Sequence, residues 1–210
     1  MQKLPIVGVM GSGSDPYRGL SQQVGTLVAR LGCHLLTGGG GGVMAETAGA
    51  FVKTEGRKGS SIGIIKGEVR EEALQNGGLG GLGGLRGLRR KFIPGTVNEA
   101  VEIPIYTHLP LSGADGKDYR SRNHINVLTA DILVALPGGE GTFSEVMLRL
   151  EYGSDVILFL GEYTIAGKPA SFFQEYGSEE YSSETGGTVR TAENGSQLEH
   201  LLKKMISSRY

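Results

Sequence analysis

The chain has 210 residues, of which 39% are hydrophobic, and its formal net charge is −1. This length suits one α/β domain with a full core, and a charge near zero gives no reason to expect binding to nucleic acid or to a membrane. The single cysteine, Cys33, cannot form an internal disulfide, and we find neither a signal peptide nor an apolar run that could span a bilayer, so we expect a cytoplasmic protein.

Short apolar runs alternate with amphipathic ones along the chain. Strands are expected at residues 4–11, 33–39, 60–67, 101–107, 131–139, 155–161 and 186–192. Helices are expected at residues 17–32, 42–56, 118–130, 140–152 and 194–207. Continuous apolar strands that alternate with helices form parallel sheets covered on both faces. The sequence therefore predicts a doubly wound, Rossmann-like α/β fold, with residues 1–210 as one nucleotide-binding domain.

Residues 67–100 interrupt this alternation as a glycine-rich insertion. Within it, residues 76–92 read NGGLGGLGGLRGLRRKF, where leucines recur among glycines and a basic cluster follows. Each glycine disfavours helix by roughly 1 kcal/mol, so we predict a mobile surface loop. The alternative is a lid whose basic cluster meets a bound phosphate. Residues 172–186 predict a second, acidic excursion that Phe172 and Phe173 could anchor.

Three glycine-rich loops each follow an expected strand: GSGSDP at 11–16, GGGGG at 38–42 and PGGEGT at 137–142. In a doubly wound sheet, ligands bind beyond the carboxyl ends of the strands. Glycine lets the backbone approach a ligand closely, and free N–H groups at a helix start bind anions. One such loop could be only a tight turn. Three at one edge of the sheet predict a site for a phosphate-bearing ligand.

The signatures of common nucleotide cofactors are incomplete. Pro16 replaces the third glycine of G-x-G-x-x-G, and the second expected strand ends in Thr37 and Gly38, with no acidic residue for a ribose. A P-loop and a G-x-S-x-G motif do not occur, and the histidines lack metal-ligand spacing. We therefore expect a small mononucleotide as the ligand, with no metal and no separate cofactor.

Three segments resemble the Lonely-guy (LOG) family of nucleoside 5′-monophosphate phosphoribohydrolases. PGGEGTFSE at 137–145 is similar to the PGGxGTxxE motif, and GGGGGVM at 38–44 to the GGGxGxM loop. Residues 121–139 resemble the arginine-bearing helix and strand before the main motif. The resemblance implies hydrolysis of AMP-like, including cytokinin-type, nucleotides to a base and ribose 5-phosphate. It also implies a homodimer or higher homo-oligomer, with the helices expected at 118–130 and 140–152 at the contact.

By this resemblance the catalytic pair is Arg122 and Glu145. An arginine offers a planar charged fork for phosphate or ribose oxygens, and a carboxylate can stabilise the positive charge that develops on ribose. Four apolar residues of the expected helix form one stripe toward the sheet: Phe143, Val146, Met147 and Leu150. Glu145 then lies on a different side and can face the ligand edge. The alternative is an exposed Glu145–Arg149 pair, worth about 0.3–0.5 kcal/mol.

The loops and the resemblance together assign the phosphate and nucleotide contacts. The assigned residues are Gly11, Ser12, Gly38, Gly39, Gly40, Met44, Pro137, Gly138, Gly139, Gly141 and Thr142. LOG enzymes commonly follow the arginine with lysine, whereas this chain carries Asn123, which brings it closer to less characterised relatives. Similar sequences include proteins described as molybdenum-cofactor carriers. A non-catalytic carrier of a nucleotide or of molybdenum cofactor is therefore the alternative function.

Overall fold

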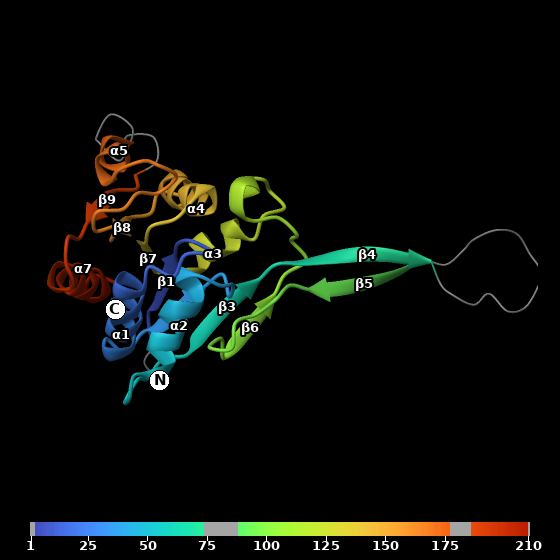
Figure 1. The fold of residues 1–210 in the computed structure, drawn as a ribbon, viewed down its shortest axis with the longest axis horizontal. Coiled ribbons are helices and arrows are strands. Elements are labelled where there is room, and N and C mark those ends of the chain that lie inside the picture. The colour runs from blue at the N-terminus through green and yellow to red at the C-terminus, as the bar shows by residue number, and fades with distance from the viewer. Residues whose placement is uncertain (1–2, 74–87, 177–185, 210) are drawn as a thin grey trace, which may run out of the picture.

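A seven-stranded parallel sheet forms the centre of the protein (Figure 1). The computed structural model describes residues 3–73, 88–176 and 186–209. The strands of this sheet are β1 (Ile6–Met10), β2 (His34–Thr37), β3 (Ser61–Ile65), β6 (Ile103–Tyr106), β7 (Ile132–Ala135), β8 (Val156–Leu158) and β9 (Val189–Thr191). Their order is β6-β3-β2-β1-β7-β8-β9, and all neighbours pair in parallel. The predicted doubly wound α/β fold is confirmed.

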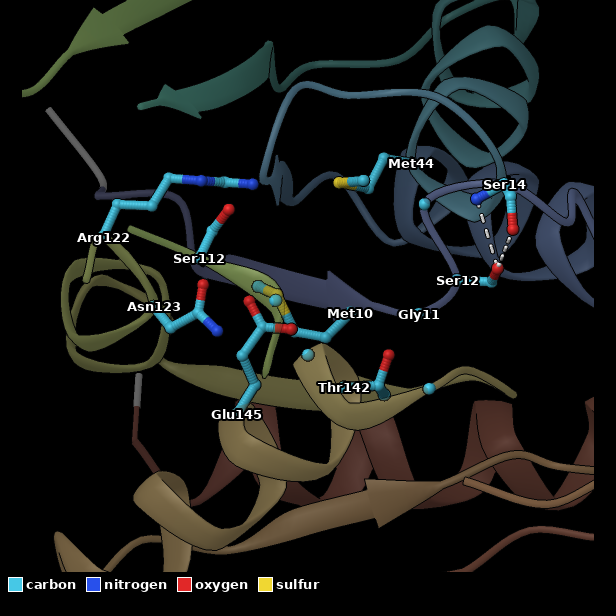
Figure 2. Close-up of a pocket in the computed structure, with 14 residues that line it drawn as sticks. Met10, Gly11, Ser12, Ser14, Met44, Ser112, Arg122, Asn123, Thr142 and Glu145 are labelled. Atoms are coloured by element: carbon cyan, nitrogen blue, oxygen red, sulfur yellow. Dashed lines mark hydrogen bonds between the residues drawn. The ribbon is translucent and has the colours of Figure 1, made fainter. Parts of the chain in front are cut away.

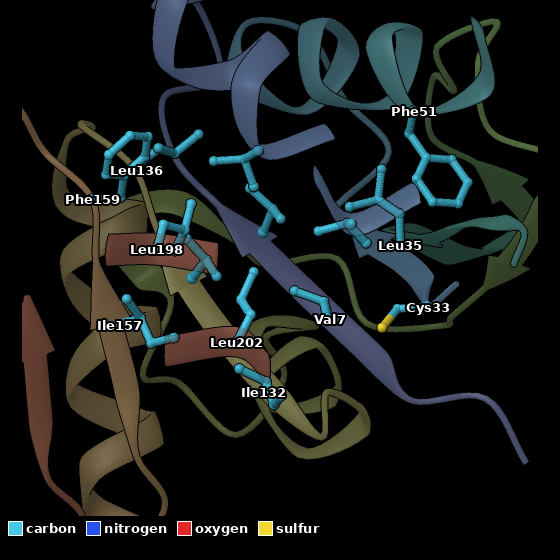
Figure 3. Close-up of a cluster of buried hydrophobic side chains, with 14 of the residues drawn as sticks. Val7, Cys33, Leu35, Phe51, Ile132, Leu136, Ile157, Phe159, Leu198 and Leu202 are labelled. Carbon is cyan, nitrogen blue, oxygen red and sulfur yellow. The ribbon is translucent and has the colours of Figure 1, made fainter. Parts of the chain in front are cut away.

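Helices cover both faces of the sheet. One face carries α1 (Arg18–Arg30), α2 (Val43–Lys53) and α7 (Gly195–Ser207), and the other carries α3 (Asn123–Thr129), α4 (Glu140–Glu151) and α5 (Ala170–Tyr176). Val7 of β1 packs with Phe51 and Leu202 on the first face (Figure 3), whereas Met10 packs on the second. Burial on both sides explains why central strands such as β1 and β7 read as continuous apolar runs, whereas the edge strand β6 is apolar but exposed. None of the helices in the described segments could cross a membrane.

The strand order reverses between β1 and β7. From β1 the sheet grows through β2 and β3 to β6, and the chain then returns to the centre at β7 before it adds β8 and β9. The helices α1 and α4, which follow β1 and β7, leave toward opposite faces. Such a switch point opens a crevice beyond the carboxyl ends of the two strands. Residues 11–16 and 137–142 both lie at this crevice.

The helix expected at 118–130 is shorter in the structure. It begins at Asn123, and the residues before it form a turn in which the N–H of Ser121 donates to the carbonyl of Asp118 at 2.8 Å. The Ser121 hydroxyl accepts from the N–H of Asn123 at 3.1 Å, which offers the backbone an alternative to the helix. Arg122 therefore lies at the N-cap of α3 and not inside the helix.

A two-stranded antiparallel ribbon, β4 (Gly67–Ala73) and β5 (Leu88–Pro94), extends away from the sheet (Figure 1). Residues 88–92, predicted in a loop, therefore belong to a strand. The remainder of that loop falls on residues 76–87, outside the described residues, and the basic cluster of the lid alternative lies partly there and partly in β5, which holds Arg89, Arg90 and Lys91. Phe92 packs edge-to-face on Tyr106 of β6 at the root of the ribbon, with 6.2 Å between ring centroids.

The second predicted excursion, residues 172–186, also differs from expectation. Its first residues belong to α5, where Phe173 is fully buried and in ring contact with Phe143 of α4. Phe173 thus anchors this segment to the core. Residues 177–185 lie outside the described residues.

Candidate functional site

A cavity of about 350 Å³ opens at the switch point between β1 and β7 (Figure 2). This volume lies within the range of about 300–1,000 Å³ typical of small-molecule sites. Its walls come from segments far apart in the sequence, namely residues 10–14, Met44, residues 112–113, residues 122–123 and four residues at the start of α4: Gly139, Gly141, Thr142 and Glu145. The fold thus gathers the ends of two strands and the starts of three helices around one space.

The cavity brings together most of the predicted site residues. Those that line it are Gly11, Ser12, Met44, Arg122, Gly139, Gly141, Thr142 and Glu145. The predicted residues that do not line it are Gly38, Gly39, Gly40, Pro137 and Gly138. Lining residues that the sequence analysis did not assign are Met10, Gly13, Ser14, Ser112, Gly113 and Asn123.

The predicted glycines outside the lining make room for functional side chains. A Cβ on Gly38 would lie 2.2 Å from Nη1 of Arg122, so the guanidinium packs directly on bare backbone. A Cβ on Gly138 would lie 2.2 Å from Oγ1 of Thr142. Gly39 has φ +71°, a conformation that L side chains rarely adopt. These glycines therefore position the site without facing the ligand space.

The loop after β1 is fixed by its neighbours. The N–H of Ser12 donates to the carbonyl of Pro137 at 3.0 Å, and the N–H of Val43 donates to the carbonyl of Ser12 at 2.9 Å. The Ser12 hydroxyl accepts from the N–H groups of Ser14 and Asp15 at 3.2 and 2.9 Å. The first N–H of α2 is thus used within the protein. The start of α2 therefore has fewer free N–H donors for a ligand than the start of α4.

The N-terminus of α4 presents free donors to the cavity. Gly139 is its N-cap, no side chain of the described residues caps it, and the N–H of Phe143 makes the bond to the Gly139 carbonyl at 3.0 Å. The N–H groups before Phe143 therefore have no partner within the helix. The Thr142 hydroxyl is buried and has no hydrogen-bond partner among the described residues. Unpaired donors at a helix N-terminus favour an anion.

Glu145 lies one turn further along α4 and faces the same cavity (Figure 2). The residue is 7% exposed, and its Oε1 accepts from Nδ2 of Asn126 at 2.7 Å. Burial raises the pKa of Glu145 to about 7, although the charge of Arg122 and the Asn126 hydrogen bond act in the opposite direction. At neutral pH this carboxyl group is therefore available in both its acidic and its basic form.

The predicted alternative of an exposed Glu145–Arg149 pair is wrong. Arg149 is 3% exposed, and its guanidinium donates to the carbonyls of Val127, Ala130 and Asp131 at 2.6, 2.8 and 2.9 Å. These carbonyls end α3 and lead into β7, so Arg149 joins α4 to that turn. Its role is structural, and it leaves Glu145 to the cavity.

Arg122 reaches the cavity from the start of α3 (Figure 2). Its Nη1 donates to the carbonyl of Ile64 in β3 at 2.7 Å, and its Nε is buried with no partner among the described residues. Burial lowers the pKa of Arg122, and the nearby Glu145 opposes that change. A buried cation with donors to spare favours an anionic or oxygen-rich ligand.

Asn123 is the lining residue that sequence reasoning came closest to finding, since its identity was the departure from the LOG pattern. It is 2% exposed, and its Nδ2 donates to the Ser144 hydroxyl at 3.0 Å. Ser112 and Gly113 come from an irregular segment between β6 and α3, and no sequence pattern marked them. In the described segments no group of histidine, cysteine, aspartate or glutamate side chains could hold a metal ion.

Comparisons with known proteins agree with this architecture. The model of the SLOG cluster4 family matches residues 4–191. A protein of Archaeoglobus fulgidus, described as uncharacterized, is 31% identical over 157 residues, which are 73% of this chain and 79% of the relative. The molybdenum cofactor carrier protein of Chlamydomonas reinhardtii matches at 25% identity over 98% of this chain and 99% of its own, with a TM-score of 0.65. The molybdenum cofactor binding protein of Rippkaea orientalis matches at 28% identity over 98% and 99%, with a TM-score of 0.64.

Proposed function

Because this chain belongs to the SLOG cluster4 family, we propose that its cavity binds a nucleoside 5′-monophosphate and hydrolyses the N-glycosidic bond to release the base and ribose 5-phosphate. One observation carries the proposal. Arg122 and Glu145 line a single cavity together with the uncapped N-terminus of α4. A cation, a carboxyl group of near-neutral pKa and a set of free N–H donors are the parts that such a reaction needs.

The phosphate binds at the start of α4. The N–H groups of Gly141 and Thr142 and the unpartnered Thr142 hydroxyl supply donors, and the helix dipole favours negative charge by about 0.3–1 kcal/mol. A Cβ on Gly139 would meet no atom within 4 Å, so the space beside this backbone is open to the ligand. A larger side chain at this N-cap would occupy the space through which the phosphate approaches the backbone.

Glu145 acts at the reacting carbon. In the hydrolysis, a water oxygen bonds to C1′ of the ribose while the bond from C1′ to the base nitrogen breaks, and the base leaves with the electron pair and takes up a proton. Positive charge develops on the ribose as the bond breaks. The ionised carboxylate stabilises that charge and accepts the proton of the attacking water. Its pKa of about 7 keeps the basic form available at neutral pH.

Arg122 grips oxygen atoms of the sugar or the phosphate. Its guanidinium is held from one side by the carbonyl of Ile64, at 2.7 Å, and packs against the bare backbone of Gly38. An arginine held in this way is preorganised, so little side-chain entropy is lost when the ligand arrives. We therefore expect Arg122 to contribute to ligand binding as well as to turnover.

A carrier of molybdenum cofactor is the second candidate, favoured by one specific observation. The two solved structures named as molybdenum cofactor proteins match nearly the whole chain, at 25% and 28% identity. A pterin that bears a phosphate group would use the same donors at the start of α4. The protonated form of Glu145, which its raised pKa favours, would then donate a hydrogen bond instead of acting as a base.

Incubation of the purified protein with a panel of nucleoside monophosphates separates the two candidates. The proposed reaction releases a free base and ribose 5-phosphate in equal amounts, which chromatography detects. A panel in which no monophosphate is cleaved, together with tight binding of molybdenum cofactor, would replace the hydrolase by the carrier.

A further inference from the structure

We infer that Asn123 is a specificity-determining residue that accepts a hydrogen bond from the 2′-hydroxyl of the ligand's sugar, so that the cavity takes ribose in preference to 2-deoxyribose. The inference rests on the proposed function, because it assumes a sugar phosphate in the cavity. It is carried by a hydrogen-bond chain from Asn123 through Ser144 to Gly141, behind the cavity wall.

This hydrogen-bond chain fixes the orientation of the Asn123 amide. The Ser144 hydroxyl donates its single proton to the carbonyl of Gly141 at 2.7 Å. Toward Asn123 it can only accept, so the nitrogen Nδ2 must face Ser144, at 3.0 Å. The amide oxygen Oδ1 is then left on the opposite side. Figure 2 shows that oxygen directed toward Ser112, on the side of the cavity where Arg122 lies.

The protein packs tightly around the hydrogen-bonded pair of Asn123 and Ser144. Asn123 and Ser144 are 2% and 4% exposed. A Cβ on Gly116 would lie 1.9 Å from Oγ of Ser144 and 2.5 Å from Nδ2 of Asn123. Gly116 has φ −60° and ψ −27°, which any residue can adopt, so its conformation does not require glycine. The close approach of the hydrogen-bonded pair does require it.

The chemistry of the wall selects a hydroxyl group. Oδ1 of Asn123 is an acceptor only, whereas the guanidinium of Arg122, which lines the same cavity, is a donor only. A sugar hydroxyl can donate to the first and accept from the second at once. A carbon-bound hydrogen, as in 2-deoxyribose, would leave Oδ1 of Asn123 without a donor and would offer no acceptor to the N–H groups of Arg122 that Ile64 does not use.

The position along the ligand favours the 2′-hydroxyl. The phosphate binds at Thr142, and in the view of Figure 2 the labelled side chains follow one another along the cavity from Thr142 past Glu145 to Asn123. In a nucleoside 5′-monophosphate, the 2′ carbon adjoins the reacting C1′ and lies one bond farther from the phosphate than the 3′ carbon. The hydroxyl next to the reacting carbon is therefore the one that Asn123 meets.

Calorimetric titration with ribose 5-phosphate and 2-deoxyribose 5-phosphate tests the inference without any chemical step. The wild-type protein should bind ribose 5-phosphate about tenfold more tightly, the scale of one hydrogen bond to a buried acceptor. Asn123→Leu should abolish the preference, and Asn123→Asp, which keeps an acceptor oxygen, should retain it. Ser144→Ala should weaken the preference, because the amide is then free to turn its nitrogen to the cavity.

His124→Gln is the matched control. His124 neighbours Asn123 but bonds to the Tyr152 hydroxyl and the Asp118 carbonyl at 2.6 and 3.0 Å, and does not line the cavity. The control should keep the tenfold preference, and loss of the preference there would overturn a specific role for Asn123. Equal affinity of the wild type for both sugar phosphates would overturn the inference and leave the hydrolase proposal standing. If the protein prefers ribose 5-phosphate but cleaves no nucleoside monophosphate, the inference about Asn123 stands and the hydrolase proposal is contradicted.

Discussion

Replacing Glu145 with glutamine should change how the stability of this protein depends on pH. Glutamine keeps the size of the side chain and its contact with Asn126 but cannot ionise. Burial raises the pKa of Glu145 from 4.5 to about 7, a difference of about 2.5 pH units, which corresponds to about 3 kcal/mol of ionisation penalty in the folded state. The folded protein holds this proton more tightly than the unfolded chain does. The stabilisation is therefore complete below pH 4.5 and is lost as the pH rises to about 7.

Urea denaturation of both proteins at pH 5 and pH 8 measures this effect. Because part of the penalty is already present at pH 5, the wild type should lose about 2–3 kcal/mol of unfolding free energy relative to Glu145→Gln between the two conditions. Glu55→Gln, at an exposed position just beyond the end of α2, is the control and should leave the pH dependence as in the wild type. Parallel stability curves for wild type and Glu145→Gln would refute the claim that Glu145 ionises in a desolvated site.

Three further predictions follow from the geometry of the cavity and its surroundings. Gly139→Val should lower the unfolding free energy by only about 1 kcal/mol, the cost of valine at an N-cap, because an added Cβ meets no protein atom within 4 Å. It should lower AMP affinity at least tenfold by calorimetry, since the side chain occupies the phosphate space, and unchanged affinity would show that the loop is only a turn. Arg122→Ala should weaken both AMP binding and turnover, and a change in only one of them would contradict the role given to this cation. Light scattering at micromolar concentration should give at least the mass of a dimer, and Leu128→Asp should lower that mass. The reason is that Leu128 on α3 and Tyr152 beside the end of α4 expose apolar surface, with exposed fractions of 61% and 43%. A monomeric wild type would contradict the predicted assembly.

The central sheet could be predicted from the sequence because a strand buried on both faces is apolar at every position. Strands such as β7 are covered on both faces, so every residue from Ile132 to Ala135 is apolar and fully buried. The ribbon strand β5 has no continuous apolar run, because it follows a glycine-rich segment and pairs only with β4. Its backbone pairing across the ribbon is a property of tertiary structure that local composition does not reveal.

Side-chain burial at the site was harder to predict than the location of the site. The periodicity of α4 placed Glu145 away from the apolar stripe, and the structure has it at the cavity. The alternative of an exposed pair with Glu145 put Arg149 on the surface, whereas it is buried. Its burial depends on carbonyls at the end of α3 that need donors, and a single helix pattern does not contain that information. The contact of Gly38 with Arg122 likewise joins two segments far apart in sequence.

The most direct test of the proposed reaction is the rate of adenine release from AMP by the wild-type protein and by Glu145→Gln. The wild type should release adenine and ribose 5-phosphate. Glu145→Gln should bind AMP with similar or greater affinity, because one negative charge near the phosphate is gone, and should release adenine at least about 100-fold more slowly. Equal rates for the two proteins would contradict the role of Glu145, and no release by the wild type from any nucleoside monophosphate would contradict the hydrolase itself.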